Sequence, residues 1–168
     1  MGRGSSAPNR AAEVFRSILR HRPQDADADA YAGFGEAEFA LGNYRAAQAD
    51  FQIASRLRPG DERISAQLEL AGQVLALDPM RRGIGPQERS QRSRKLVELA
   101  LEGVRGCAGA TPQQPLAELM EKARKRNADV EANLDLAERL WQARRSECGP
   151  ATSPADQAFA LVMARIAQ

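Results

Sequence analysis

The sequence predicts an all-α protein built from antiparallel helix pairs. Along most of the 168-residue chain, apolar residues recur at three- and four-residue spacing, and no stretch alternates as a strand would. Proline or glycine interrupts this period repeatedly, which is typical of short helices separated by turns. A set of positions also recurs at an offset of 36 residues: Ala11, Phe15, Ile18 and Pro23 correspond to Ala47, Phe51, Ala54 and Pro59. Together these observations favour helix pairs stacked into an α-solenoid.

Each helix is expected between recognisable start and stop signals. Gly42 suits the left-handed backbone at a helix end, and Asp61 is placed to cap the helix that follows it. Pro154 and Asp156 suit the first turn of the last helix. The expected helices span residues 8–22, 29–41, 43–57, 61–77, 87–104, 115–126, 129–145 and 154–167.

One segment carries a spaced motif of aromatic and small residues. Small residues are required where two helices cross closely, and aromatic residues fill the space around the crossing. Residues 28–61 resemble the tetratricopeptide repeat (TPR) family in this respect, although Glu38 stands where a tyrosine is usual. The motif reads Tyr31, Phe34, Gly35, Gly42, Tyr44, Ala47, Phe51, Ala54 and Pro59.

The resemblance covers residues 28–61 well, residues 8–25 in part, and the rest weakly. It implies a TPR-like α-solenoid with a helical C-terminal cap. We therefore expect a flexible leader at residues 1–7, TPR-like helices at 8–79, and a helical C-terminal part at 80–168 that packs on the repeats.

The residue inventory disfavours catalysis and metal binding. His21 is the sole histidine, although imidazole is the commonest metal ligand and the usual general base. The glycine-containing segment 83–86 lacks the lysine of a phosphate-binding loop. We expect no enzyme, metal or cofactor. Cys107 and Cys148 lie beyond helix ends, and either a disulfide between them or two free thiols remains open.

In the TPR family, the inner face of each first helix holds the ligand. The resemblance implies a binding groove that is acidic and lined by small side chains. It lacks the lysine and asparagine pattern that clamps carboxylate tails, so a basic or amphipathic peptide or helix of another protein suits it better. The matching positions are Asp29, Ala32, Gly33, Glu36, Phe39 and Ala40.

A first alternative is a structural subunit that forms a homodimer. The helix at 8–22 lacks the partner helix that should precede it, so an apolar stripe is expected to stay uncovered. Self-association would then involve Phe15, Ile18 and Leu19.

A second alternative is an adaptor for RNA or anionic lipid. Residues 1–78 carry a net charge of −2 and residues 79–168 a net charge of +4. No aromatic residue accompanies the basic cluster, so a stacking platform is missing and nucleic acid is disfavoured. The cluster comprises Arg81, Arg82, Arg89, Arg92, Arg94 and Lys95.

The sequence does not fix a compartment. No apolar run approaches the length of about 20 residues that a membrane-spanning helix needs. The cytoplasm is the default expectation, and the bacterial periplasm or cell envelope stays open if a signal has been removed.

Overall fold

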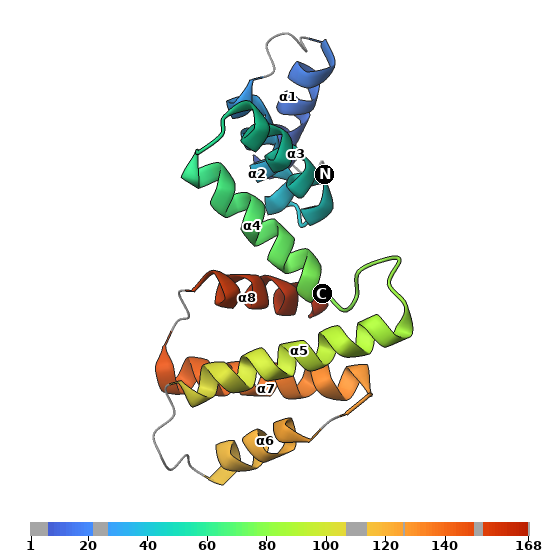
Figure 1. Ribbon diagram of the computed structural model, residues 1–168, viewed down its shortest axis with the longest axis vertical. Coiled ribbons are helices and arrows are strands. Elements are labelled where there is room, and N and C mark those ends of the chain that lie inside the picture. Colours follow the sequence, from blue (N-terminus) through green and yellow to red (C-terminus); the bar gives the residue numbers. More distant parts are fainter. Residues whose placement is uncertain (1–6, 22–26, 107–113, 126, 150–152, 168) are drawn as a thin grey trace, which may run out of the picture. The chain divides into compact units, whose positions relative to one another are not determined.

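The computed structural model describes residues 7–21, 27–106, 114–125, 127–149 and 153–167 (Figure 1). These ranges contain eight helices and no strand, which confirms the all-α prediction. The chain divides into two compact units, residues 1–75 and 76–168, and the division falls within the fourth helix. The helices are α1 (Ala7–His21), α2 (Ala28–Ala40), α3 (Tyr44–Leu57), α4 (Glu62–Leu77), α5 (Pro86–Arg105), α6 (Gln114–Arg124), α7 (Val130–Cys148) and α8 (Pro154–Ile166).

The helix ends use the signals expected from the sequence. Gly42 follows α2 with φ +78°, a left-handed conformation that glycine adopts without a steric penalty. The Asp61 carboxylate accepts a hydrogen bond of 3.2 Å from the Ile64 amide at the start of α4, so the predicted cap is confirmed. Ser153 and Asp156 form a reciprocal capping box at the start of α8.

In the first unit, α2 and α3 form a close-packed helical hairpin. A Cβ atom added at Gly35 would lie 2.7 Å from Cε1 of Phe51, so a larger residue at this position would collide with the ring. Ala47 on α3 is completely buried. The prediction of small residues at the crossing is therefore confirmed.

Helix α4 completes the core of this hairpin. Ile64 packs with Ala28, Ala32 and Ala54, and Tyr31 lies against the same cluster. A second cluster joins the three helices further along, and its members are Ala47, Phe51, Ala71, Phe39 and Leu68. The burial of these residues depends on three helices and not on the hairpin alone.

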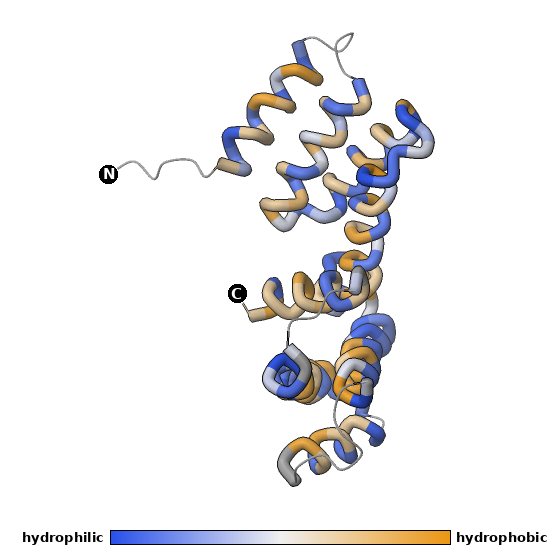
Figure 2. Tube along the Cα trace, turned by 90° about the vertical axis from the view of Figure 1, so that its left-hand side faces the viewer, coloured by the Kyte–Doolittle hydropathy of each residue, from blue (hydrophilic) through white to orange (hydrophobic). Residues whose placement is uncertain are grey.

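The second unit is organised around α5 and α7, which lie side by side (Figures 1 and 2). Helix α6 lies on one side of this pair and α8 on the other, in both views. Trp141 of α7 packs on Phe159 of α8 with ring centroids 4.6 Å apart. Arg144 and Asp156 add an ion pair of 3.1 Å between the same two helices. No helix in the described part of the chain is long and apolar enough to cross a membrane.

Candidate functional site

The acidic residues expected to form the groove on α2 are paired with arginines of the same unit. Asp29 accepts two hydrogen bonds of 2.7 Å from the Arg58 guanidinium, which holds the pKa of the carboxyl below its ordinary value. Arg63 at the start of α4 lies 3.8 Å from Asp29 and also pairs with Glu36. Two carboxylates thus face two guanidiniums, and the face does not present the uncompensated acidic charge that the sequence suggested.

The apolar residues of the expected groove contribute mainly to packing. Ala32 is 1% exposed within the core of the first unit. The ring of Phe15 occupies the space that a side chain at Gly33 would need. Phe39 is half-buried with its ring 4.9 Å from that of Tyr44, whereas Ala40 is exposed. Much of the α2 surface therefore holds α1 and α4 in place.

The stripe on α1 is partly covered by α2. Phe15 packs on α2 at Gly33, and Ile18 and Leu19 are half-buried. Val14, which belongs to the same apolar stripe, is 59% exposed. Any self-association through α1 would centre on Val14 more than on Phe15.

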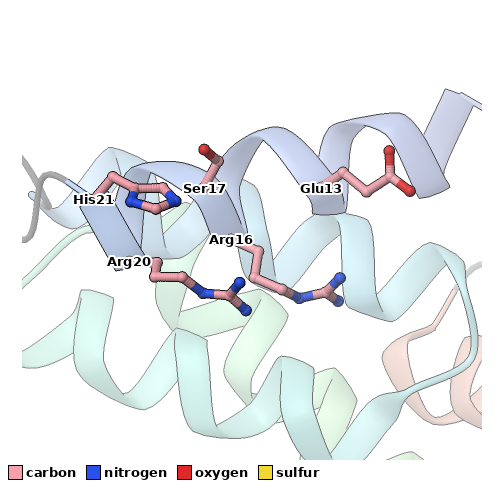
Figure 3. Close-up of a pocket in the computed structure, with 5 residues that line it drawn as sticks. All are labelled: Glu13, Arg16, Ser17, Arg20 and His21. Atoms are coloured by element: carbon pink, nitrogen blue, oxygen red, sulfur yellow. The ribbon is translucent and has the colours of Figure 1, made fainter.

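A hollow of about 290 Å³ lies among the side chains of α1 itself. In Figure 3, Arg16 and Arg20 point toward the neighbouring helices, while Ser17 points away from them. The residues that line it, Glu13, Arg16, Ser17, Arg20 and His21, all come from this one helix. Because no second element closes the hollow among the described residues, it would offer a ligand contacts from one side only.

Glu38 stands where the TPR motif usually has a tyrosine, and its carboxylate connects α2 to α1 through an ion pair. Its carboxylate is nearly buried and accepts hydrogen bonds from Arg16 of α1 at 3.1 Å and from Asn43 at 2.6 Å. The Arg16 guanidinium also lies 5.6 Å from the centre of the Phe34 ring. Burial, together with the negative charge of Glu38, raises the pKa of Asp50 on α3 to about 6.

The described side chains of the basic cluster at residues 81–95 have different surroundings. Arg92 pairs with Glu88 and donates a hydrogen bond of 3.1 Å to the carbonyl oxygen of Asp78, so it stabilises the turn before α5. Arg89 and Arg94 line two different grooves. A phosphate-binding patch at residues 81–95 stays a prediction.

The larger groove, which we call the apolar groove, lies between α5, α7 and the end of α8 and has a volume of about 680 Å³. Met80 at its edge is 52% exposed, and its amide donates a hydrogen bond of 2.8 Å to the Asp78 carboxylate. Arg165 pairs with the same carboxylate at 3.2 Å, which ties the end of α8 to the turn. Its lining comprises Met80, Pro86, Arg89, Ser90, Ala128, Val130, Glu131, Leu134, Arg165 and Ile166.

The smaller groove, which we call the basic groove, has a volume of about 250 Å³ and lies on the α6 side of α5 and α7. Glu98 is the one acidic residue among the described lining residues, and it lies 3.4 Å from Lys95. The lining comprises Arg94, Val97, Glu98, Leu101, Arg105, Ala123, Arg124, Lys125 and Asn133. Sequence analysis missed both grooves, because their residues come together only when α5, α6, α7 and α8 pack.

The cysteine and metal hypotheses concern a few residues. Cys107 and the side chain of Cys148 lie outside the described residues, so a disulfide between them stays a prediction. Within the described ranges, no group of three histidine, cysteine or acidic side chains is placed to hold a metal ion.

Comparisons of the chain with protein-family models, with curated proteins and with solved structures found no match. The resemblance to the TPR family therefore rests on the motif in residues 28–61.

Proposed function

We propose that this chain is a non-catalytic interaction module that binds a peptide or helix of another protein. The observation that carries the proposal is the apolar groove of about 680 Å³ beside α8. Its size and lining suit the apolar side chains of a bound segment. The TPR resemblance supports the same class of function, since members of that family bind proteins, but it would place the site on α2.

Charge and packing favour the apolar groove over the α2 face. On α2, the carboxylates of Asp29 and Glu36 are engaged by Arg58 and Arg63. A ligand would have to displace those ion pairs before it gained its own. The apolar groove instead exposes Met80, whose flexible thioether adapts to different apolar partners.

The occupant that fits this groove is an amphipathic helix with one narrow apolar face. Val130, Leu134 and Ile166 supply apolar contacts within the groove. Arg89 and Glu131, of opposite charge, line the same groove and can pair with charges beside that apolar face. Such a ligand would bury apolar side chains without leaving a buried charge unpaired.

Selection of binding peptides from a random displayed library tests the proposal. We expect amphipathic sequences with apolar residues at helical spacing, and we expect Met80→Asp to weaken their binding about tenfold or more. Leu57→Asp is the matched control, because Leu57 is 53% exposed in the first unit and Met80 is 52% exposed in the second. Peptides that bind Met80→Asp as well as the wild type would place the site elsewhere.

The proposal also includes the absence of turnover. Assays for hydrolase and transferase activity on purified protein are expected to show no rate above background. A reproducible rate that a single substitution in one of the grooves abolishes would overturn the assignment as a binding module.

A further inference from the structure

Several cations gather along the basic groove. Arg94, Arg105 and Lys125 have no ion-pair partner among the described residues. Arg124 pairs with Glu121 at 2.6 Å but remains about half exposed. Among the described residues, the groove therefore holds more positive charge than Glu98, its one acidic lining residue, can balance.

The floor of the same groove includes apolar side chains beside the buried amide of Asn133. Val97 and Leu101 of α5 are 5% and 6% exposed, and Ala123 of α6 is half-buried beside them. The cations come from α5 and from the end of α6, the two helices that border this floor. A partner that fits must present small apolar side chains flanked by negative charges.

We propose that the basic groove binds an acidic amphipathic peptide segment of a partner protein. Its carboxylates would pair with Arg94, Arg105 and Lys125, and its apolar side chains would rest on Val97 and Leu101. Arginine suits this task because its guanidinium binds a carboxylate through two parallel hydrogen bonds. This is a second docking site, and it rests on the proposed function only in assuming that the chain binds proteins.

The lining favours a peptide over a nucleic acid. A single strand is commonly held by bases stacked on aromatic side chains, and none of the described lining residues is aromatic. The apolar floor would leave phosphates and sugars without a matching surface. RNA is therefore a competing outcome that the experiment must be able to report.

The test uses fluorescence anisotropy with defined probes on the whole chain. The probes are a labelled helical peptide of about 16 residues made of glutamate and leucine in an amphipathic pattern, its lysine counterpart, and a labelled single-stranded RNA. We expect the glutamate peptide to bind with higher affinity than either of the other probes. Its affinity should fall when the salt concentration rises from about 0.05 to about 0.15 M.

A charge-reversal variant should lower the affinity for the glutamate peptide about tenfold or more. It combines Arg94→Glu, Arg105→Glu and Lys125→Glu. The matched control reverses three exposed arginines outside the groove, Arg45→Glu, Arg56→Glu and Arg139→Glu, and should stay within about twofold. Circular dichroism of both variants establishes that the helices persist.

Three results would overturn the inference. One is an equal loss of affinity in the groove variant and the control, which would indicate non-specific attraction. Another is RNA binding that exceeds peptide binding and is lost in the groove variant. The third is unchanged affinity when serine replaces leucine in the peptide, because the apolar floor would then have no role.

Met80→Asp separates this inference from the proposed function. This variant should bind the glutamate peptide with unchanged affinity, because Met80 lines the apolar groove and does not line the basic groove. Loss of library-selected peptides without loss of the glutamate peptide would support both sites. Retention of the selected peptides in Met80→Asp, with loss of the glutamate peptide in the groove variant, would contradict the proposed function and leave the basic groove standing.

Discussion

Two charged regions of the molecule differ: the acidic face of α2 in the first unit and the basic groove in the second. In the first unit, Asp29, Glu36 and Glu38 pair with arginines that come from other helices or from the end of α3. In the second unit, Arg94 and Arg105 face a groove without a partner among the described residues. The difference shows that an acidic surface in the sequence is no guide to a ligand until its internal partners are known.

The cores differ as well. Alanine dominates the buried positions of the first unit, where short side chains allow the helices to approach closely. Larger apolar residues fill the second unit, including Leu96, Leu140, Phe159 and Val162. We therefore expect the stability of the first unit to depend on its few large buried side chains. In the second unit, grooves remain between the helices.

The largest expected effect comes from the one phenylalanine that is fully buried in the first unit. Phe51→Ala removes a ring that is 1% exposed and contacts Gly35, and it should lower the free energy of unfolding by about 3–5 kcal/mol. Chemical denaturation followed by circular dichroism measures this loss. Val14→Ala, at an exposed position, is the control and should change stability by less than about 0.5 kcal/mol. Equal losses in the two variants would contradict the packing described here.

The partly buried carboxyl of Asp50 should also make the stability of the first unit depend on pH. The pKa of Asp50 is raised to about 6 in the folded protein, from an ordinary value of 3.8. The folded state therefore binds this proton more tightly, and the resulting stabilisation is present at low pH and is lost as the pH rises through about 6.

Asp50→Asn removes this titration and isolates its contribution. In the wild type, the Asp50 contribution should raise the melting temperature as the pH falls from about 7 to about 5, and the difference between the two proteins should follow that titration. A difference that stays constant across this range would show that the Asp50 carboxyl is not perturbed. Thermal melts monitored by circular dichroism at each pH are sufficient.

A smaller effect is expected where the ion pairs are exposed. Glu36→Arg breaks the pair with Arg63 and places two cations together, so it should cost up to about 1 kcal/mol of stability. Peptides selected on the apolar groove should bind this variant within about twofold of the wild type. A large loss of affinity would indicate that the peptides bind on α2, where the family resemblance predicts the site.

The smallest effect on stability is expected from Val14→Glu, which tests self-association. Val14 is exposed on α1, so the substitution should change the melting temperature little. If wild-type protein dimerises through α1, sedimentation equilibrium should show a dimer that Val14→Glu converts to a monomer. A wild type that stays monomeric at high concentration would remove the dimer hypothesis. Phe15→Glu is a poorer test, because its ring packs on α2.

The sequence allowed the helices to be predicted because their signals are local. The glycine turn at Gly42 and the cap at Asp61 depend on neighbouring residues, and both occur where expected. The pairing of Glu36 with Arg63 could not be read in the same way, because it depends on how α4 packs against α2. The residues expected to form the groove do lie on one helix, α2, but the arginines that pair with them were not foreseen.

The two grooves could not be predicted from the sequence, for a related reason. Met80 lies in the segment between α4 and α5, and nothing in the neighbouring sequence indicates that Leu134 and Ile166 share a groove with it. The net positive charge of residues 79–168 was a signal that this part differs from the first. It did not show which cations remain without an internal partner.

The position of α4 limits how such a chain can be shortened or extended. Ile64, Leu68 and Ala71 of α4 complete the two clusters that the α2–α3 hairpin begins. A truncation after Pro59, the last residue of the sequence motif, would remove α4 and therefore expose Ala47, Phe51 and Ala54 to water. The sequence motif spans a pair of helices, whereas the two buried clusters draw on three. Removal of the third helix would therefore leave an apolar surface that favours aggregation.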